Sequence, residues 1–188
     1  DDVCAGVLIW YNTEVVVVEQ EEVLVPGRIL KARVRVIADG TVFDLVNAYM
    51  PTKGSAMEPR TMARLALTRA GLQAAADAAD AAKRSLIIGG DLQAQTARAL
   101  EQSKGGSGNE HDAWLETYNA TNSMFSAGEV EATYSAGAGG AQTAIDHWLV
   151  GMEMEQCVMA EVGAGADGLM DDDAVEGTKG HNSLQLRV

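Results

Sequence analysis

The stretch 85–94 constrains the fold more than any other part of the chain, because it joins an apolar run to two glycines and an acid. The apolar run 86–88 predicts a short buried strand, and Gly89-Gly90 predicts a sharp turn that ends it. Asp91 comes directly after this turn. Because ligands bind beyond strand ends in open α/β sheets, Asp91 is a candidate ligand for a hard divalent cation. The alternative is that Asp91 caps the next helix.

The length and composition are those of one ordinary globular domain. The chain has 188 residues, of which 47% are hydrophobic and 22% charged, and this is enough for one sizeable core. No apolar run is long enough to span a membrane, and the chain does not open with a secretory signal. Two cysteines are compatible with a reducing compartment. We therefore expect an intracellular protein, nuclear or cytoplasmic, with no membrane partner.

The net charge of −13 bears on which partners the protein can bind. Nucleic-acid binding depends largely on basic side chains that neutralise phosphates. The field of an acidic chain opposes that attraction, although a local basic face can still supply it. The charge therefore argues against a nuclease.

Two apolar runs near the start, 5–10 and 15–18, are rich in β-branched residues and predict a strand pair or one interrupted strand. Such a strand lies unusually close to Asp1, because a domain ordinarily has some lead-in. We therefore expect that the chain lacks the first strands of its domain.

The stretch 28–36 alternates between basic and apolar residues, which predicts a strand with Lys31, Arg33 and Arg35 on one face. A partner strand, 42–48, follows a hairpin-turn signal. The three basic residues form either a solvated strand face or a phosphate-facing patch, and a solvated face is the commoner case.

Helix signals are fewer than strand signals in the rest of the chain. Pro59 suits the first turn of a long helix, 59–82, and a shorter helix is expected at 112–118. His111-Asp112 is either a metal-binding pair or the N-terminal cap of that helix. Short strands are predicted at 133–135, 145–150, 155–162 and 183–188. This order indicates a single α/β domain, 1–188, whose sheets are mostly antiparallel or mixed.

Four short motifs, in this order, resemble those of the endonuclease/exonuclease/phosphatase superfamily. The pattern is closest to the AP-endonuclease-like domains of non-LTR (LINE-type) retrotransposons, and the resemblance runs from about Gly6 to Val188. The motifs are Asn47-Ala48-Tyr49-Met50-Pro51, Gly90-Asp91-Leu92-Gln93, Ile145-Asp146-His147 and Gly180-His181-Asn182. Their order and spacing carry more weight than any one of them.

The resemblance implies a DNase I-like, four-layered α/β sandwich of two mostly antiparallel or mixed sheets flanked by helices. It also implies a phosphodiesterase site that depends on Mg²⁺ or Mn²⁺. In that site His181 is the base that activates water, or a transition-state stabiliser, and Asp146 orients its imidazole. Asp91 binds metal or positions the nucleophile. The resemblance assigns substrate contacts to Asn47, Tyr49 and Gln93.

The sequence departs from the family pattern at several positions. Gln93 stands where the family has asparagine, and Gly180 replaces the aspartate before the histidine. In the third motif, Ala144 and His147 replace an arginine and a tyrosine. The family's two earlier motifs, including the glutamate that is its main metal ligand, would lie upstream of this chain. One or two carboxylates hold Mg²⁺ poorly.

Some of these residues also fit plainer roles. Taken alone, His181 is more often an ordinary loop histidine, and Tyr49 is more often a half-buried packing residue with a solvated hydroxyl. Asp146 is harder to explain in this way, because a carboxylate buried in an apolar strand needs a partner.

The leading interpretation is a divalent-metal-dependent phosphodiester hydrolase, a retroelement-type DNA endonuclease domain that binds DNA despite its charge. A first alternative is a catalytically inactive remnant of the same fold. A second is a phosphatase that acts on a small phosphorylated molecule or lipid headgroup, which suits a net charge of −13 better than DNA does.

Overall fold

The computed structural model describes residues 7–52, 58–102, 109–127, 134–136, 142–155, 159–163, 179–181 and 183–187. For 102, 134–136, 142 and the residues beyond 155, it describes the backbone alone. The chain divides into two compact units, Asp1–Asp91 and Leu92–Val188. That residues 1–188 act as a single domain stays a prediction.

The first unit contains a mixed sheet with its strands in the order β1-β2-β3-β4. β1 pairs antiparallel with β2, and β2 with β3, whereas β3 and β4 run parallel. The strands are β1 Val16–Val25, β2 Ile29–Val36, β3 Val42–Tyr49 and β4 Ser85–Asp91. The strands predicted at 28–36 and 42–48 are therefore confirmed.

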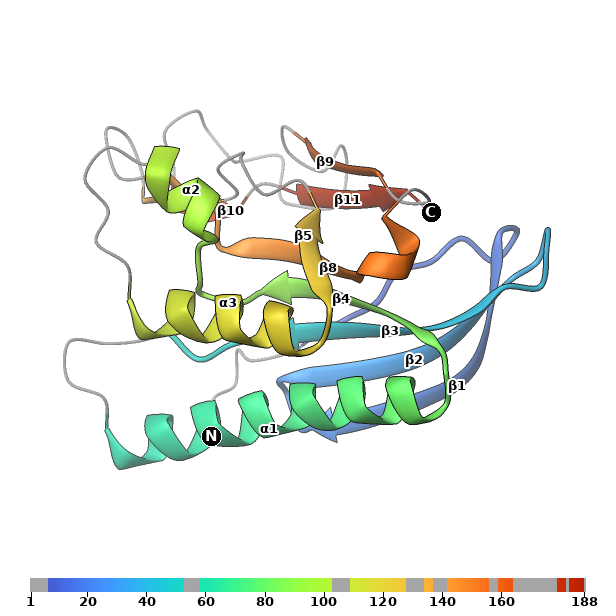
Figure 1. Cartoon of the computed structure of the whole chain (residues 1–188), viewed down its shortest axis with the longest axis horizontal. Helices are drawn as coiled ribbons and strands as arrows, with labels where there is room; N and C mark the ends of the chain where they lie inside the picture. Colours follow the sequence, from blue (N-terminus) through green and yellow to red (C-terminus); the bar gives the residue numbers. More distant parts are fainter. Residues whose placement is uncertain are drawn as a thin grey trace. The chain divides into compact units, whose positions relative to one another are not determined.

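Helix α1, Pro59–Ala81, makes contacts with all four of these strands and runs alongside them (Figure 1). Pro59 stands at the N-terminal end, where its missing N–H breaks no intrahelical bond. The helix comes close to the sheet at Gly71, where an added Cβ would lie 2.8 Å from side-chain atoms of Val25 and Ile29. The long helix predicted at 59–82 is confirmed, and it covers the sheet face on which Ile29 lies.

Two basic residues of β2, Lys31 and Arg33, lie on this covered face beside Asp44 of β3. Strand alternation places Lys31 and Arg33 on the same face as Ile29. Asp44 is fully buried. Its carboxylate forms ion pairs with Lys31 Nζ at 3.6 Å, Arg33 Nε at 3.4 Å and Arg84 Nη2 at 3.1 Å.

Both interpretations of the basic face are therefore wrong for Lys31 and Arg33. The helix covers this face, and both cations are paired with a fully buried carboxylate, with Lys31 10% and Arg33 29% exposed. Arg35, farther along β2, pairs with Glu19 of β1 at 2.8 Å, where the two side chains are 40% and 36% exposed.

The second unit holds three sets of paired strands. β5 pairs antiparallel with β8, β6 lies between β10 and β7, and β9 pairs antiparallel with β11. The strands are β5 Met124–Ala127, β6 Tyr134–Ala136, β7 Gln142–Thr143, β8 Asp146–Gly151, β9 Met159–Gly163, β10 Lys179–His181 and β11 Ser183–Arg187, with a 3₁₀ turn at Met152–Met154. The four strands predicted here correspond to β6, β8, β9 and β11.

Helices α2, Ala97–Gln102, and α3, Glu110–Thr121, have well-defined starts. Asn109 caps α3 by accepting from the backbone amides of His111 and Asp112, and Asp112 accepts in return from the Asn109 amide at 2.6 Å. This capping box confirms that His111-Asp112 belongs to the helix cap. At α2, the amide of Ala97 donates to the carboxylate of Glu116 on α3 at 2.7 Å.

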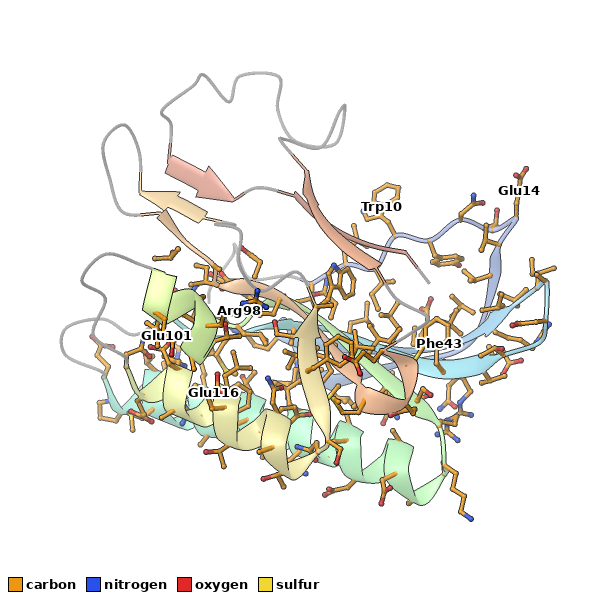
Figure 2. All side chains as sticks on the ribbon, turned by 45° about the horizontal axis from the view of Figure 1, so that its top comes forward. Trp10, Glu14, Phe43, Arg98, Glu101 and Glu116 are labelled. Carbon is orange, nitrogen blue, oxygen red and sulfur yellow. The ribbon has the colours of Figure 1, made fainter. Side chains whose placement is uncertain are left out.

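The first fifty residues differ from the sequence-based prediction in two ways. Residues 7–10 form no strand, residues 5 and 6 lie outside the described part of the chain, and Trp10 is 74% exposed (Figure 2). β1 instead continues from Val16 through the charged stretch 19–22 to Val25. In the strand order of the described residues β1 is the outer strand, and charged side chains on such a strand are tolerated and guard against aggregation. Among the described residues, no helix has both the length and the apolar character needed to cross a membrane.

Candidate functional site

Two of the predicted site residues end neighbouring parallel strands in the first unit. Tyr49 is the last residue of β3 and Asp91 the last of β4, and the two are paired in register. Asn47 lies two residues earlier on β3. Strand alternation places all three on the face opposite to the one that α1 covers. The backbone continues this register past the strand ends, because the Met50 amide donates to the Asp91 carbonyl at 2.8 Å.

The glycines before Asp91 do not end the strand, contrary to the prediction. β4 continues through them to Asp91, and Gly90 has a φ of +135°. A Cβ on Gly90 would lie 2.0 Å from the carbonyl oxygen of Ala48 on β3. Glycine is therefore needed because the two strand ends approach too closely for any side chain, and this close approach brings Tyr49 beside Asp91.

The helix-cap alternative for Asp91 is also wrong. The next helix, α2, begins at Ala97, and the hydroxyl of Thr96 accepts from the backbone amide of Ala99 at 3.2 Å. Thr96 thus has the capping position. Asp91 lies five residues before it, at the end of a strand.

Arg28 is a site candidate that the sequence-based reasoning missed. Its guanidinium carbon lies 4.6 Å from the centroid of the Tyr49 ring, and its carbonyl accepts from the Tyr49 amide at 2.9 Å. A tight turn through Pro26 and Gly27 places it there, with Arg28 donating back to Val25 at 2.9 Å and Gly27 at a φ of 69°. The alternation of side chains along the strand predicted at 28–36 could have identified it, because alternation places Arg28 on the face opposite to Lys31.

Asn47 is engaged by the N-terminal segment. Its side-chain amide donates to the carbonyl of Leu8 at 2.5 Å, and Asn47 Oδ1 lies toward Gly90. If Asn47 contacts a substrate through its N–H group, the bond to Leu8 has to open. Its role in substrate binding stays a prediction.

In the second unit, the backbone brings Gln93 and Asp146 together. Asp146 is the first residue of β8 and is half-buried. The amide of Leu92, just before Gln93, donates to the carbonyl of Ile145, just before Asp146, at 2.9 Å. Gln93 has a φ of +53°, a left-handed conformation that costs a non-glycine residue about 1–2 kcal/mol. Asparagine, which the resembled family has here, adopts this conformation more readily.

His181, the predicted base, is the last residue of β10 and pairs with Tyr134 of β6. The structure describes its backbone but not its side chain. The predicted pairing of its imidazole with Asp146 therefore stays a prediction. Asn182, the last residue of that motif, lies outside the described residues.

The described residues do not make up a metal centre by themselves. Among them, no group of three or more His, Cys, Asp or Glu side chains is placed to hold an ion. The carboxylate of Asp91 and the amide oxygen of Gln93 are the right kind of donor for Mg²⁺ but too few to bind it well.

Comparison with known proteins gives matches at the level of structure. No protein-family model matches the sequence, and no curated protein does. An endonuclease/exonuclease/phosphatase family protein from Bacteroides thetaiotaomicron matches with a TM-score of 0.54 at 12% identity, covering 81% of this chain and 57% of that one. The 3'-5' exonuclease NExo from Neisseria meningitidis matches with a TM-score of 0.57 at 17% identity, covering 85% and 64%.

A mannosyl-6-phosphatase from Bacteroides thetaiotaomicron has a TM-score of 0.57 at 9% identity, and the match covers 95% of this chain and 69% of that one. The chain thus spans a little over half to about two thirds of the length of these structures. At such identities the likeness concerns the fold, and the predicted DNase I-like α/β class is confirmed. The chain has the fold of the endonuclease/exonuclease/phosphatase superfamily.

Proposed function

We propose that the protein is a phosphate-ester hydrolase whose substrate binds at the ends of β3 and β4. The observation that carries the proposal is the grouping of Tyr49, Asp91 and Arg28. Tyr49 and Asp91 are paired in register, and the Arg28 guanidinium lies 4.6 Å over the Tyr49 ring. A planar guanidinium and a phenol hydroxyl are donors suited to phosphate oxygens. Arg28 also brings a positive charge to this strand end in a chain of net charge −13.

In this proposal each residue has a separate chemical task. Arg28 and Tyr49 bind the phosphate oxygens that do not leave. His181 takes a proton from the attacking water, and Asp146 holds the imidazole in the tautomer that can accept it. Asp91 accepts a hydrogen bond from the same water and so directs its lone pair at phosphorus.

Dependence on Mg²⁺ or Mn²⁺ belongs to the proposal as well. Asp91 is the ligand that the family resemblance implies, with the Gln93 amide oxygen as a neighbouring hard donor. Such an ion would neutralise charge on the phosphate when bound. Addition of EDTA is expected to abolish turnover, and restoration by Mn²⁺ or Mg²⁺, but not by Ca²⁺ or Zn²⁺, would identify the ion.

The finer proposal for the substrate is DNA, with the chain acting as a retroelement-type endonuclease domain. The motif order supports it, and so does the fold shared with a 3'-5' exonuclease. A small phosphorylated molecule is the second candidate. The net charge favours it, and a mannosyl-6-phosphatase has a similar fold.

Two substrates and one variant test these proposals. Wild-type protein with Mn²⁺ is given supercoiled plasmid and, separately, mannose 6-phosphate. The variant His181→Ala is expected to lower the rate on the preferred substrate by about 10²–10⁴-fold, the usual contribution of a general base. Glu19→Gln, which alters an exposed ion pair on β1, is the matched control and is expected to keep full activity. Equal rates for wild type and His181→Ala would refute the assignment of His181.

The inactive-remnant alternative rests on Gly180, on Gln93 and on the small donor set of the described residues. It predicts no turnover of either substrate and no heat of Mn²⁺ binding in calorimetry. Saturable Mn²⁺ binding that disappears in Asp91→Asn would count against it, even if neither substrate is cleaved.

A further inference from the structure

Gln93 and Asp146 are bracketed by two hydrogen bonds, one on each side. On the N-terminal side, the Leu92 amide donates to the Ile145 carbonyl at 2.9 Å. On the C-terminal side, the bond comes from a side chain, because Nε2 of His147 lies 2.6 Å from the carbonyl oxygen of Ala94. His147 thus contacts the backbone of the Gln93 turn at Ala94, three residues after the end of β4.

The ring of His147 has a defined protonation pattern in this setting. The Ala94 carbonyl can only accept, so Nε2 carries the proton and donates. On the other side of the ring, Nδ1 lies 2.9 Å from the hydroxyl of Ser126 on β5, which can donate to the free lone pair. His147 is 1% exposed and Ser126 is 8% exposed. A neutral imidazole with its proton on Nε2 satisfies both bonds without burying a charge.

The backbone conformation of the turn at Gln93 is unfavourable and has to be stabilised by its surroundings. Gln93 has a φ of +53°, which a residue with a Cβ adopts rarely and which persists only when its surroundings impose it. The next residue is also tied down, because the Gln95 amide donates to the carboxylate of Asp112 at 2.6 Å. The Gln93 turn is therefore fixed at Leu92, Ala94 and Gln95, while the Gln93 side chain takes no part in these three bonds.

We propose that His147 and Ser126 are positioning residues, which hold the strained Gln93 turn in register with Asp146. Asp146 and His147 are neighbours on β8, so their side chains lie on opposite faces of the strand. In this proposal Asp146 takes part in the reaction, and His147, on the opposite face, holds the Gln93 turn in place. This proposal rests on the proposed hydrolase function only for the consequence of the alignment; the alignment itself is a property of the fold.

The alignment is tested first without any substrate. Long-range ¹H–¹⁵N spectra of the imidazole report which ring nitrogen carries the proton, and the backbone amide of Gln93 reports the conformation of the turn. We expect the neutral Nε2–H form in the wild type. His147→Phe removes both ring bonds and is expected to shift the Gln93 amide strongly. His147→Gln can offer an amide N–H near the position of Nε2, so it is expected to leave the Gln93 amide close to its wild-type position.

The consequence is tested by turnover of whichever substrate the wild type cleaves. Misplacing a reacting or binding group by about 1 Å can cost about 10²-fold. We therefore expect His147→Phe to lower kcat/KM by about 10–100-fold, and His147→Gln to recover most of the loss. Ser126→Ala keeps the ring and is expected to give a smaller loss of the same kind. Thr117→Val, which deletes an exposed hydroxyl on α3 that donates to the Ala113 carbonyl of the preceding helix turn, is the matched control.

Three outcomes would overturn the proposal: an Nδ1–H or doubly protonated ring, an unchanged Gln93 amide in His147→Phe, or equal losses in His147→Phe and His147→Gln. If His147→Phe does not fold, the ring tautomer of the wild type and the Gln93 amide of Ser126→Ala decide the question. An inactive wild type would refute the hydrolase function, whereas the spectra would still show whether His147 holds the turn.

Discussion

Among single residues, Asp44 is notable because one buried carboxylate is paired with three basic side chains. Its carboxylate is fully buried and neutralises two cations from strand β2 and one from the loop after α1. Arg84 binds it through two nitrogens, at 3.2 and 3.1 Å. The cluster therefore ties the end of the helix to the sheet beneath it.

We predict that Asp44→Asn destabilises the protein by about 3–5 kcal/mol, because it leaves three cations near one another without their counter-ion. Urea denaturation followed by circular dichroism measures this loss. Glu19→Gln is the matched control, since it breaks an exposed ion pair between β1 and β2 that is worth about 1 kcal/mol or less. Similar losses for the two variants would show that the cluster does not behave as a buried one.

Asp39, in the turn between β2 and β3, gives a prediction about pH. The backbone N–H of Thr41 donates to its carboxylate at 2.9 Å, and this bond lowers the pKa of Asp39 below its ordinary value of 3.8. A lowered folded-state pKa means that the bond contributes stability above about pH 4, and that this contribution is lost as the pH falls through the folded-state value.

We expect the Asp39 carboxyl carbon to titrate with a midpoint below 3.8 when it is followed by NMR. Asp39→Asn keeps an acceptor oxygen, so it is expected to remove this part of the pH dependence without unfolding the turn. A midpoint at or above 3.8 would contradict the hydrogen bond.

At the scale of secondary-structure elements, strand β4 decides where the candidate site forms. It runs parallel to β3 and ends in register with it, so Tyr49 and Asp91 come to the same edge of the sheet. Gly90 makes this possible, because there is no space for a Cβ next to the Ala48 carbonyl. The pairing of the end of the seven-residue strand β4 with β3 thus depends on the absence of a side chain at Gly90.

We predict that Gly90→Ala destabilises the protein by about 3 kcal/mol or more, since it adds a backbone clash to the strain of its φ of +135°. Gly40→Ala is the matched control. Gly40 also has a positive φ, of +75°, but an added Cβ there meets nothing within 4 Å. Its cost should be limited to the conformational penalty of about 1–2 kcal/mol. Thermal unfolding of both variants measures the difference, and equal shifts would refute the close-approach argument.

At the scale of the whole molecule, the dominant property is charge. The chain carries a net charge of −13 with only 14 lysines and arginines. Four of these basic residues, Lys31, Arg33, Arg35 and Arg84, are paired with carboxylates in the described part of the chain. Long-range electrostatics therefore oppose a polyanion, so binding of a phosphate would depend on cations close to the site.

We predict that the apparent affinity for plasmid does not increase as the salt concentration is lowered. Proteins that neutralise many DNA phosphates behave in the opposite way. Lower salt lengthens the screening distance, from about 10 Å at 0.1 M to about 30 Å at 0.01 M, so the acidic surface repels DNA more. The KM for plasmid is expected to rise on dilution of salt, and the KM for mannose 6-phosphate to change much less. A KM for plasmid that falls steeply at low salt would reveal a basic DNA-binding face.

Local patterns in the sequence were enough to predict most of the elements. Alternation in 28–36 and 42–48, Pro59 at a helix start and the apolar run 145–150 each depend on neighbours within a few residues, and β2, β3, α1 and β8 follow from them. The order of four short motifs was enough for the fold class. β5 was missed because its four residues, Met124–Ala127, carry too short a pattern.

Packing in three dimensions sets which face of the sheet is buried and which distant residues each side chain contacts. Alternation places Lys31 and Arg33 on one face, but α1, which begins more than twenty residues later, makes that face the buried one. In the sequence Gly90 predicts a turn, whereas in the structure glycine is needed there because the Ala48 carbonyl of another strand lies so close. In the same way, Arg28 meets Tyr49 and His147 meets Ala94 through contacts between residues 21 and 53 positions apart. Such contacts depend on the packing of distant segments, which no local pattern encodes.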